Sequence, residues 1–233
     1  MDAGPSRIAQ NLIKRVENSY RHYDTYRLFR HHTMIAPRVY TANLKLATSA
    51  ADIPGAVVEC GTWKGGMIAG IARILGPRDY WLFDSFAGLP EAEPIDGPKA
   101  RKWQANTTSR RYYNNCAASE DDAAEAMQRT GIPNPHLVKG WFEDSLPTAV
   151  FPHGIAILRM DADWYKSTYQ ILDSLFPQVN AGGLIVVDDY REWVGCRKAV
   201  HDYLSQHDRR ERVERFRRVY YMTKLTADHQ PDD

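Results

Sequence analysis

The chain carries several short apolar runs, each bounded by glycine, proline or a carboxylate. The clearest is 184–187, where four apolar residues, three of them β-branched, follow Gly182 and Gly183. Such a run is typical of a short buried strand, with the glycine pair as the turn before it. Similar runs occupy 56–60, 80–84, 136–139 and 155–160. Residues 212–225 predict one or two further strands, as an antiparallel pair at the sheet edge.

Apolar residues at helical spacing fill most of the intervals between these strands. This spacing predicts a helix from about Met67 to Gly76, one over 165–176 that Pro177 ends, and one across 199–204. Ser119, followed by acidic residues, marks a further helix start. Before it, the polar stretch from Ser85 is expected to be a long loop. The whole pattern predicts a single large α/β domain.

Residues 1–50 precede the first strong strand and are expected to be mostly helical. We therefore divide the chain into an N-terminal helical cap, 1–50, and a main domain, 51–233. The tyrosines and histidines of the cap are most simply packing or surface groups. A lid over a ligand is the functional alternative, with Thr33 and Met34 as its candidate residues.

Composition excludes several classes of function. The 233 residues carry a formal net charge of +1, so the balance does not suggest a nucleic-acid partner. Cys60, Cys116 and Cys196 are scattered and are expected to be reduced thiols, without zinc-ligand spacing. No apolar run suits a membrane span or a signal peptide. We expect a cytoplasmic protein that binds no membrane.

Carboxylates follow two of the predicted strands at the point where each ends. Asp161 and Asp163 come after 155–160, and Asp188 and Asp189 come after 184–187. Neighbouring parallel strands would bring all four to one rim of the sheet, where ligands of open α/β sheets bind. Like charges repel, and oxygen ligands suit a hard cation such as Mg²⁺. The alternative is a set of helix caps and loop carboxylates.

A glycine turn after the first strand is the candidate cofactor site. Its spacing, from Gly61 to Gly65 and Gly66, matches neither the phosphate loop nor the dinucleotide fingerprint, so a plain tight turn is the alternative. Asp84 follows about twenty residues later, the distance at which an acid reaches ribose hydroxyls. Capping of the next turn is the alternative for Asp84.

The turn after the strand 136–139 carries further candidates for a base-binding role. Trp141 and Phe142 either flank a flat ring or anchor the loop. Asp144 and Ser145 either bond a base edge or cap the following turn.

Five stretches together resemble the macrocin/mycinamicin-type sugar O-methyltransferases, and they are 59–66, 83–90, 140–147, 160–165 and 187–190. The resemblance spans about 33–190. It implies a class I, Rossmann-like fold with a seven-stranded, mostly parallel sheet and an N-terminal helical lid. It also implies two cofactors, S-adenosylmethionine and Mg²⁺.

The resemblance implies a role for each motif. The residues implied to contact S-adenosylmethionine are Thr33, Glu59, Gly61, Thr62, Gly65, Asp84, Ser85, Trp141, Phe142, Asp144 and Ser145. Mg²⁺ would be bound by Asp161, Asp188 and Asp189, and Asp163 would be the general base. Met34 and Tyr190 would contact the acceptor. Trp164 stands where catechol methyltransferases, which are similar in fold, have a lysine.

The expected function is Mg²⁺-dependent methylation of a sugar hydroxyl on a small glycoside or an oligosaccharide, by a homodimeric enzyme. Two alternatives stay open. One is a Mg²⁺-dependent O-methyltransferase with a catechol-type acceptor. The other is a non-enzymatic nucleotide-binding module, for which the aspartate rim would be superfluous. A nicotinamide-dependent oxidoreductase is disfavoured, because the glycine spacing differs.

Overall fold

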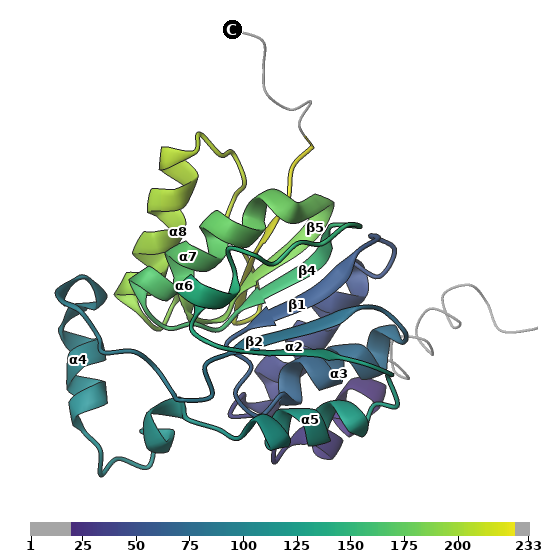
Figure 1. Cartoon of the computed structure of the whole chain (residues 1–233), viewed down its shortest axis with the longest axis horizontal. Coiled ribbons are helices and arrows are strands. Elements are labelled where there is room, and N and C mark those ends of the chain that lie inside the picture. The colour runs from purple at the N-terminus through teal and green to yellow at the C-terminus, as the bar shows by residue number, and fades with distance from the viewer. Residues whose placement is uncertain (1–19, 227–233) are drawn as a thin grey trace, which may run out of the picture.

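In the computed structural model of the protein, which describes residues 20–226, helices cover both faces of a seven-stranded sheet (Figure 1). The strands are β1 (Ala56–Cys60), β2 (Tyr80–Asp84), β3 (His136–Lys139), β4 (Ile155–Met160), β5 (Val179–Val187), β6 (Glu214–Phe216) and β7 (Val219–Thr223). Their order is β3-β2-β1-β4-β5-β7-β6. The first five run parallel, and β7 is antiparallel to β5 and to β6. The predicted α/β class and edge pair are confirmed.

Every predicted apolar run forms a strand, and β1 and β4 are buried along their whole length. Burial on both faces is the reason these runs are continuous rather than alternating. The strand β5 differs from the prediction because it begins at Val179, before the glycine pair. Gly182 has a φ of 77°, and the pairing of β5 with β4 shifts register beside it. The glycine pair is therefore an irregularity inside a strand, where a turn was expected.

Two sets of helices form the outer layers. One face of the sheet is covered by a helix at positions 20–29 and by α2 (Pro37–Ser49), α3 (Gly66–Leu75) and α5 (Glu120–Gln128). The other face is covered by α6 (Phe142–Ser145), α7 (Tyr165–Leu175) and α8 (Val194–Gln206). The predicted start of α5 is confirmed, since the Asp121 backbone N–H donates to Ser119 Oγ at 3.1 Å.

The N-terminal segment packs directly on the sheet. Phe29, Tyr40 and Leu44 are fully buried in the same core as Val57 and Ile157 of the central strands. Positions 1–19 of the predicted cap lie outside the described residues. The division into a cap and a main domain stays a prediction.

Residues 85–118, the first part of the predicted loop, contain more structure than their sequence indicated. They include 3₁₀ turns at Pro94–Asp96 and Tyr113–Cys116 and the helix α4 (Gly97–Ala105), which lies at the left side of the molecule in Figure 1. The helix α4 has no periodic apolar pattern, because Ala100 is its one buried residue. The base of the segment is fixed, since Asp96 accepts the Tyr165 backbone N–H at 2.7 Å.

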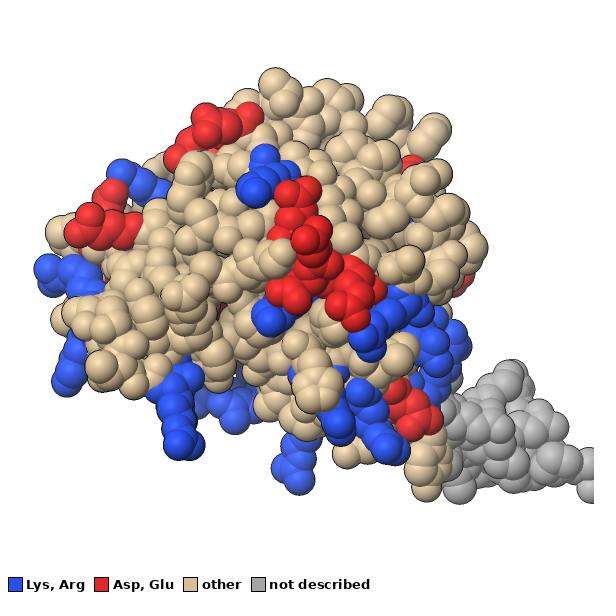
Figure 2. All heavy atoms as spheres, turned by 60° about the horizontal axis from the view of Figure 1, so that its bottom comes forward, with Lys and Arg blue, Asp and Glu red and all other residues tan. Residues whose placement is uncertain are grey.

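The surface carries charges of both signs. On the face shown in Figure 2, basic side chains lie along the lower margin and an acidic group lies near the centre. No helix within residues 20–226 is long and apolar enough to cross a bilayer.

Candidate active site

A cavity of about 650 Å³ opens at the carboxyl ends of the parallel strands. Its wall comes from the turn after β1, the end of β2, the loop before α4, the start of α6, the loop after β4 and one side of α7. The lining residues outside α7 include Gly61, Trp63, Asp84, Ser85, Leu89, Pro90, Cys116, Trp141, Phe142, Glu143, Asp161 and Asp163. One cavity therefore joins the predicted cofactor turn to the predicted aspartate rim.

The turn after β1 requires glycine where it meets β4. Gly61 has a φ of 83°, and a Cβ placed there would lie 1.7 Å from the carbonyl oxygen of Asp161. Any side chain would push the ends of β1 and β4 apart. Gly65, with a φ of 75°, is the N-cap of α3. Thr62 is buried behind the turn, and Gly61 alone of these three lines the cavity.

The N-terminus of α3 is covered by the chain itself. The Gly66 backbone N–H donates to the carbonyl oxygen of His32 at 3.0 Å, and Tyr40 donates its hydroxyl to the Gly66 carbonyl at 2.7 Å. A Cβ on Gly66 would lie 2.3 Å from the His32 oxygen, so the contact is close. A helix N-terminus of this fold commonly binds a phosphate, and here a carbonyl occupies that position.

Asp84 lies at the end of β2, where the sequence placed a ribose-binding acid. Its two carboxylate oxygens accept the backbone N–H groups of Trp63 and Phe86, each at 2.7 Å. Burial raises the pKa of Asp84, and these hydrogen bonds oppose the rise. The neighbouring Ser85 donates its hydroxyl to the Gly88 carbonyl at 3.0 Å. Both residues line the cavity, and the bonds hold Asp84 in one orientation.

The four candidates in the turn after β3 divide into two pairs. Trp141 and Phe142 line the cavity. Asp144 and Ser145 do not, among the described residues, and Ser145 donates its hydroxyl back to the Trp141 carbonyl at 2.9 Å. Glu143, which the sequence did not single out, lines the cavity between the two pairs.

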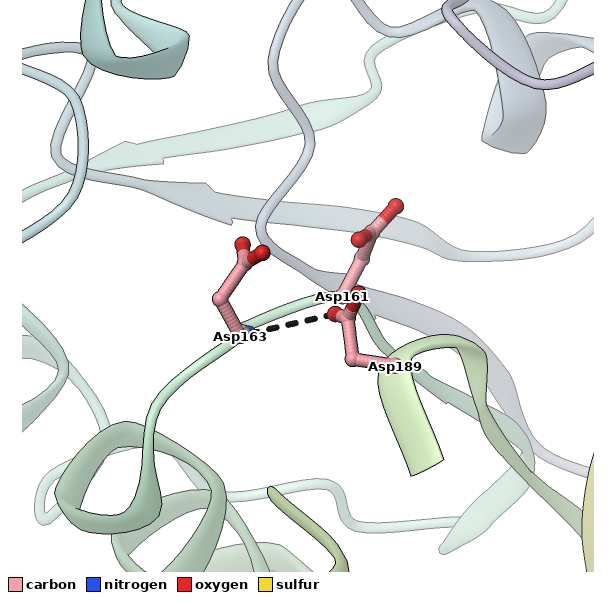
Figure 3. Close-up of side chains that lie close together, drawn as sticks. All are labelled: Asp161, Asp163 and Asp189. Atoms are coloured by element: carbon pink, nitrogen blue, oxygen red, sulfur yellow. Dashed lines mark hydrogen bonds between the residues drawn. The ribbon is translucent and has the colours of Figure 1, made fainter. Parts of the chain in front are cut away.

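Three carboxylates come together at the ends of β4 and β5 (Figure 3). Asp161, Asp163 and Asp189 each offer an oxygen, and these atoms all lie within 4.8 Å of one another. The Asp163 backbone N–H also donates to Asp189 Oδ2 at 3.1 Å, which ties the two loops together. The expectation that parallel strands bring these acids to one rim agrees with this geometry.

The electrostatics of this cluster favour a bound cation. Burial, followed by the nearby Asp161 carboxylate, raises the pKa of Asp163 to about 8. Burial, followed by the carboxylates of Asp163, Asp161 and Asp188, raises the pKa of Asp189 well above its usual range. A carboxylate set that resists full ionisation at neutral pH gains stability when a cation supplies the missing charge.

Asp188 lies beside the cluster and faces a buried guanidinium. Arg159 of β4 is 1% exposed, and its Nη2 lies 2.7 Å from Asp188 Oδ1. Its Nη1 lies 2.9 Å from both Asp161 Oδ2 and Glu59 Oε1. Burial raises the pKa of Glu59 to about 8 against the pull of Arg159, and Glu59 Oε2 has no hydrogen-bond partner among the described residues. The sequence analysis missed Arg159, although a single basic residue inside an apolar run was a usable signal.

The lid and acceptor candidates lie in different places. Met34 lines the cavity and is 38% exposed, whereas Thr33 accepts the Ile35 backbone N–H at 3.1 Å. Tyr190 shares a 2.8 Å hydrogen bond with His201 and is not among the described residues that line the cavity.

Sequence comparison identifies the family of proteins that have this arrangement. Residues 7–221 match the family described as macrocin-O-methyltransferase (TylF). The chain belongs to this family. The predicted resemblance to this family is therefore confirmed.

Two curated members of the macrocin O-methyltransferase family illustrate the relationship. Demethyldecarbamoylnovobiocin O-methyltransferase of Streptomyces niveus is 35% identical over 164 residues, which are 67% of this chain and 61% of that protein. Mycinamicin III 3''-O-methyltransferase of Micromonospora griseorubida is 33% identical over 189 residues, 76% of this chain and 71% of that protein. This chain thus spans less than two thirds of the first relative.

The fold comparison agrees with the family. The solved structure of the O-methyltransferase NovP is 31% identical, with a TM-score of 0.69, and the match covers 84% of this chain and 83% of that one. CalS11, a calicheamicin methyltransferase, shares the fold at 18% identity with a TM-score of 0.62. The predicted class I methyltransferase fold is confirmed.

Proposed function

We propose that this protein transfers a methyl group from S-adenosylmethionine to a sugar hydroxyl with the help of Mg²⁺. The observation that carries the proposal is the single cavity that joins Asp84 and the Gly61 turn to the carboxylate cluster. Family membership supports the donor and the reaction class. The relatives named for mycinamicin and novobiocin derivatives support a glycoside acceptor.

The residues around the turn after β1 fit S-adenosylmethionine better than a dinucleotide. A dinucleotide would bring a pyrophosphate to the N-terminus of α3, where the His32 carbonyl already accepts the Gly66 N–H. S-adenosylmethionine has no phosphate, and its ammonium group suits Glu59 Oε2, which lacks a hydrogen-bond partner among the described residues. This contrast disfavours the nucleotide-binding module and the nicotinamide enzyme.

Within this proposal the donor lies along the predicted cofactor residues. Asp84, held by two backbone N–H groups, would accept hydrogen bonds from the ribose hydroxyls. Trp141 and Phe142 would contact the adenine, with Asp144 and Ser145 behind them. Glu59, Thr62 and Gly65 would support the methionine end from beneath the turn, and Thr33 and Ser85 would complete the site. When bound, S-adenosylmethionine supplies an electrophilic sulfonium methyl group.

The carboxylate cluster fits a hard divalent cation, because its ligands are all oxygens and carry excess negative charge. Asp161 and Asp188 each turn one oxygen to Arg159, and the other oxygen of each would join Asp189 as a Mg²⁺ ligand. A Mg²⁺ ion held by these residues would supply Lewis acidity that makes a nearby acceptor hydroxyl easier to deprotonate.

The remaining steps belong to the chain itself. Asp163 has Oδ1 bonded to Trp193 and would receive the hydroxyl proton on Oδ2 as general base. Met34 lines the cavity and would contact the acceptor, with Tyr190 at the outer side. The walls align the acceptor oxygen with the methyl group, and this positioning supplies much of the rate. Cytoplasmic location, a homodimer and the absence of a nucleic-acid or membrane partner stay predictions.

Calorimetry and a transfer assay together test this proposal. The purified chain is titrated with S-adenosylhomocysteine, first with Mg²⁺ and then with a chelator, and binding is expected in both. It is then incubated with S-adenosylmethionine and three acceptors, namely mycinamicin III, demethyldecarbamoylnovobiocin and catechol. Mg²⁺-dependent methylation of a glycoside supports the proposal. Methylation of catechol alone would favour the catechol enzyme. Failure to bind S-adenosylhomocysteine would overturn the methyltransferase proposal.

A further inference from the structure

A tryptophan from the start of α8 contacts the carboxylate cluster. The indole Nε1–H of Trp193 donates to Asp163 Oδ1 at 2.6 Å. Trp193 is 6% exposed and is the N-cap residue of α8, so it comes from the loop after β5, whereas Asp163 comes from the loop after β4. The bond joins two loops that are 30 residues apart in the sequence.

This bond distinguishes the two oxygens of Asp163. A short bond to a carboxylate is charge-assisted and fixes the plane of the group. It engages Oδ1, while Asp163 lines the cavity and extends to the same side of its loop as Asp161 in Figure 3. The Asp163 backbone N–H is held independently by Asp189. Side chain and main chain of Asp163 are therefore each fixed by a separate partner.

The indole ring of Trp193 is itself held in place. It packs edge-on against Trp164, with ring centroids 5.1 Å apart, and against Trp103 of α4 at 5.9 Å. Trp103 and Trp164 also meet edge-on at 6.2 Å, so the three rings form a closed cluster. Edge-to-face packing of this kind restricts the rotation of each ring.

The three indole N–H groups of this cluster have different partners. Trp164 donates to the Pro90 carbonyl and Trp103 to the Arg111 carbonyl, each at 3.0 Å. Trp193 alone among the three donates to a side chain, and that side chain is the carboxylate proposed as general base. Packing needs the ring of Trp193, but it does not need its N–H group.

We propose that Trp193 is a positioning residue for methyl transfer. Its N–H holds Asp163 through Oδ1, so that Oδ2 is left to face the acceptor hydroxyl. This inference rests on the proposed function, because it assigns to Asp163 the removal of the acceptor proton. The role acts on turnover and leaves the donor site untouched.

The test compares Trp193→Phe with Trp164→Phe, since both remove an indole N–H from the same cluster. With Mg²⁺, S-adenosylmethionine and the glycoside that the wild type methylates, Trp193→Phe is expected to lower kcat at least tenfold with both KM values within twofold. Trp164→Phe, whose N–H serves a backbone carbonyl, is expected to keep kcat within threefold. Equal losses in the two variants, or an intact kcat in Trp193→Phe, overturn the role.

Nitrogen-15 spectra of the indole groups give a readout that does not depend on turnover. The chain has six tryptophans, and the Trp193 signal is assigned by its absence in Trp193→Phe. It is expected at the low-field edge of the indole region, to move upfield in Asp163→Asn and to shift on addition of Mg²⁺, whereas the Trp164 signal stays in place. A Trp193 signal that moves neither in Asp163→Asn nor on addition of Mg²⁺ overturns the inference, even if the enzyme is active. An inactive wild type with the Trp193 signal as expected would instead overturn the proposed function, and the catalytic role with it.

Discussion

Arg159 Nη2 and Asp188 Oδ1 lie 2.7 Å apart, with the guanidinium almost completely buried. The same guanidinium contacts Glu59 and Asp161, so it joins the ends of β1, β4 and β5 beneath the cavity. A buried charge is costly without partners, and here one cation serves three carboxylates. Arg159 is thus a permanent positive charge among the carboxylates at the ends of these three strands.

Replacement of Arg159 by Met is expected to destabilise the protein by about 3–5 kcal/mol, because it leaves buried carboxylates unpaired. Urea unfolding measures this as a lower midpoint with an unchanged slope. Adding Glu59→Gln to Arg159→Met removes one unpaired charge and is expected to restore part of the loss. The control, Arg129→Met, breaks an exposed pair with Glu125 and is expected to have little effect. A loss no larger than that of the control would contradict the role of Arg159.

Removal of Mg²⁺ is expected to lower the melting temperature of the wild type. At a hundred times its dissociation constant, the ion contributes about 2.7 kcal/mol, which corresponds to roughly 5–10 °C for a domain of this size. Asp189→Asn keeps the shape of the side chain and removes one repelling charge. It is expected to melt higher than the wild type in chelator and to lose the response to Mg²⁺.

The control for the metal experiment is Asp173→Asn, which changes an exposed acid on α7. It is expected to retain the full response to Mg²⁺ in the same thermal scan. A Mg²⁺ response that survives in Asp189→Asn would show that the ion binds elsewhere.

The position of α6 predicts unequal effects of two neighbouring substitutions on donor binding. Phe142 lines the cavity, whereas Asp144 does not. Phe142→Ala is expected to raise the dissociation constant of S-adenosylhomocysteine about tenfold, a loss of roughly 1.4 kcal/mol. Asp144→Ala is expected to stay within about twofold of the wild type. Calorimetry on the two variants decides, and the reverse ranking would place the adenine against Asp144.

A buried histidine makes stability depend on pH. His22 is 4% exposed, and burial together with Lys45 and Arg21 lowers its pKa to about 4 from the usual 6.5. Between pH 6.5 and about pH 4, His22 therefore binds a proton in the unfolded chain but not in the folded one. The free energy of unfolding is therefore highest above pH 6.5 and decreases as the pH falls toward 4, by about 3 kcal/mol at most.

His22→Asn removes this titration, so the difference between its unfolding free energy and that of the wild type is expected to change between pH 7 and pH 4. Urea unfolding at each pH measures the difference. His153→Asn, at an exposed position, is the control and is expected to run parallel to the wild type. A constant difference between His22→Asn and the wild type would refute the assignment.

The strands and the acidic rim could be predicted because both depend on local sequence. Buried parallel strands need continuous apolar runs, and the residues that follow such strands must meet at one edge. The helix α4 could not be predicted this way, because it packs through little of its surface and Gly97–Ala105 has no apolar period. The position of α4 depends on Trp103, which packs against Trp164 and Trp193, residues that are distant from it in the sequence.

The contacts that tune the site were also beyond the sequence. The three partners of Arg159 lie at the ends of three different strands, so the sequence alone does not identify them. Likewise, Trp193 lies 30 residues from Asp163. Asp144 and Ser145 follow a strand just as Trp141 does, yet a single turn of α6 separates those that line the cavity from those that do not. Helical phase at a four-residue helix cannot be inferred from spacing alone.

The segment 86–118, which carries α4, is held at several points. Asp96 accepts the Tyr165 backbone N–H of α7, Leu89 and Asn115 close the segment on itself through bonds of 2.9 and 2.7 Å, and Trp103 packs against Trp164 and Trp193. Asp84 and the turns after β1 and β3 lie outside this segment, which lines the cavity with Gly88, Leu89, Pro90 and Cys116. During divergence of the family, mutations in this stretch can therefore alter one wall of the cavity while the methyl-donor residues are inherited unchanged. The fold separates what evolution must keep from what it is free to vary.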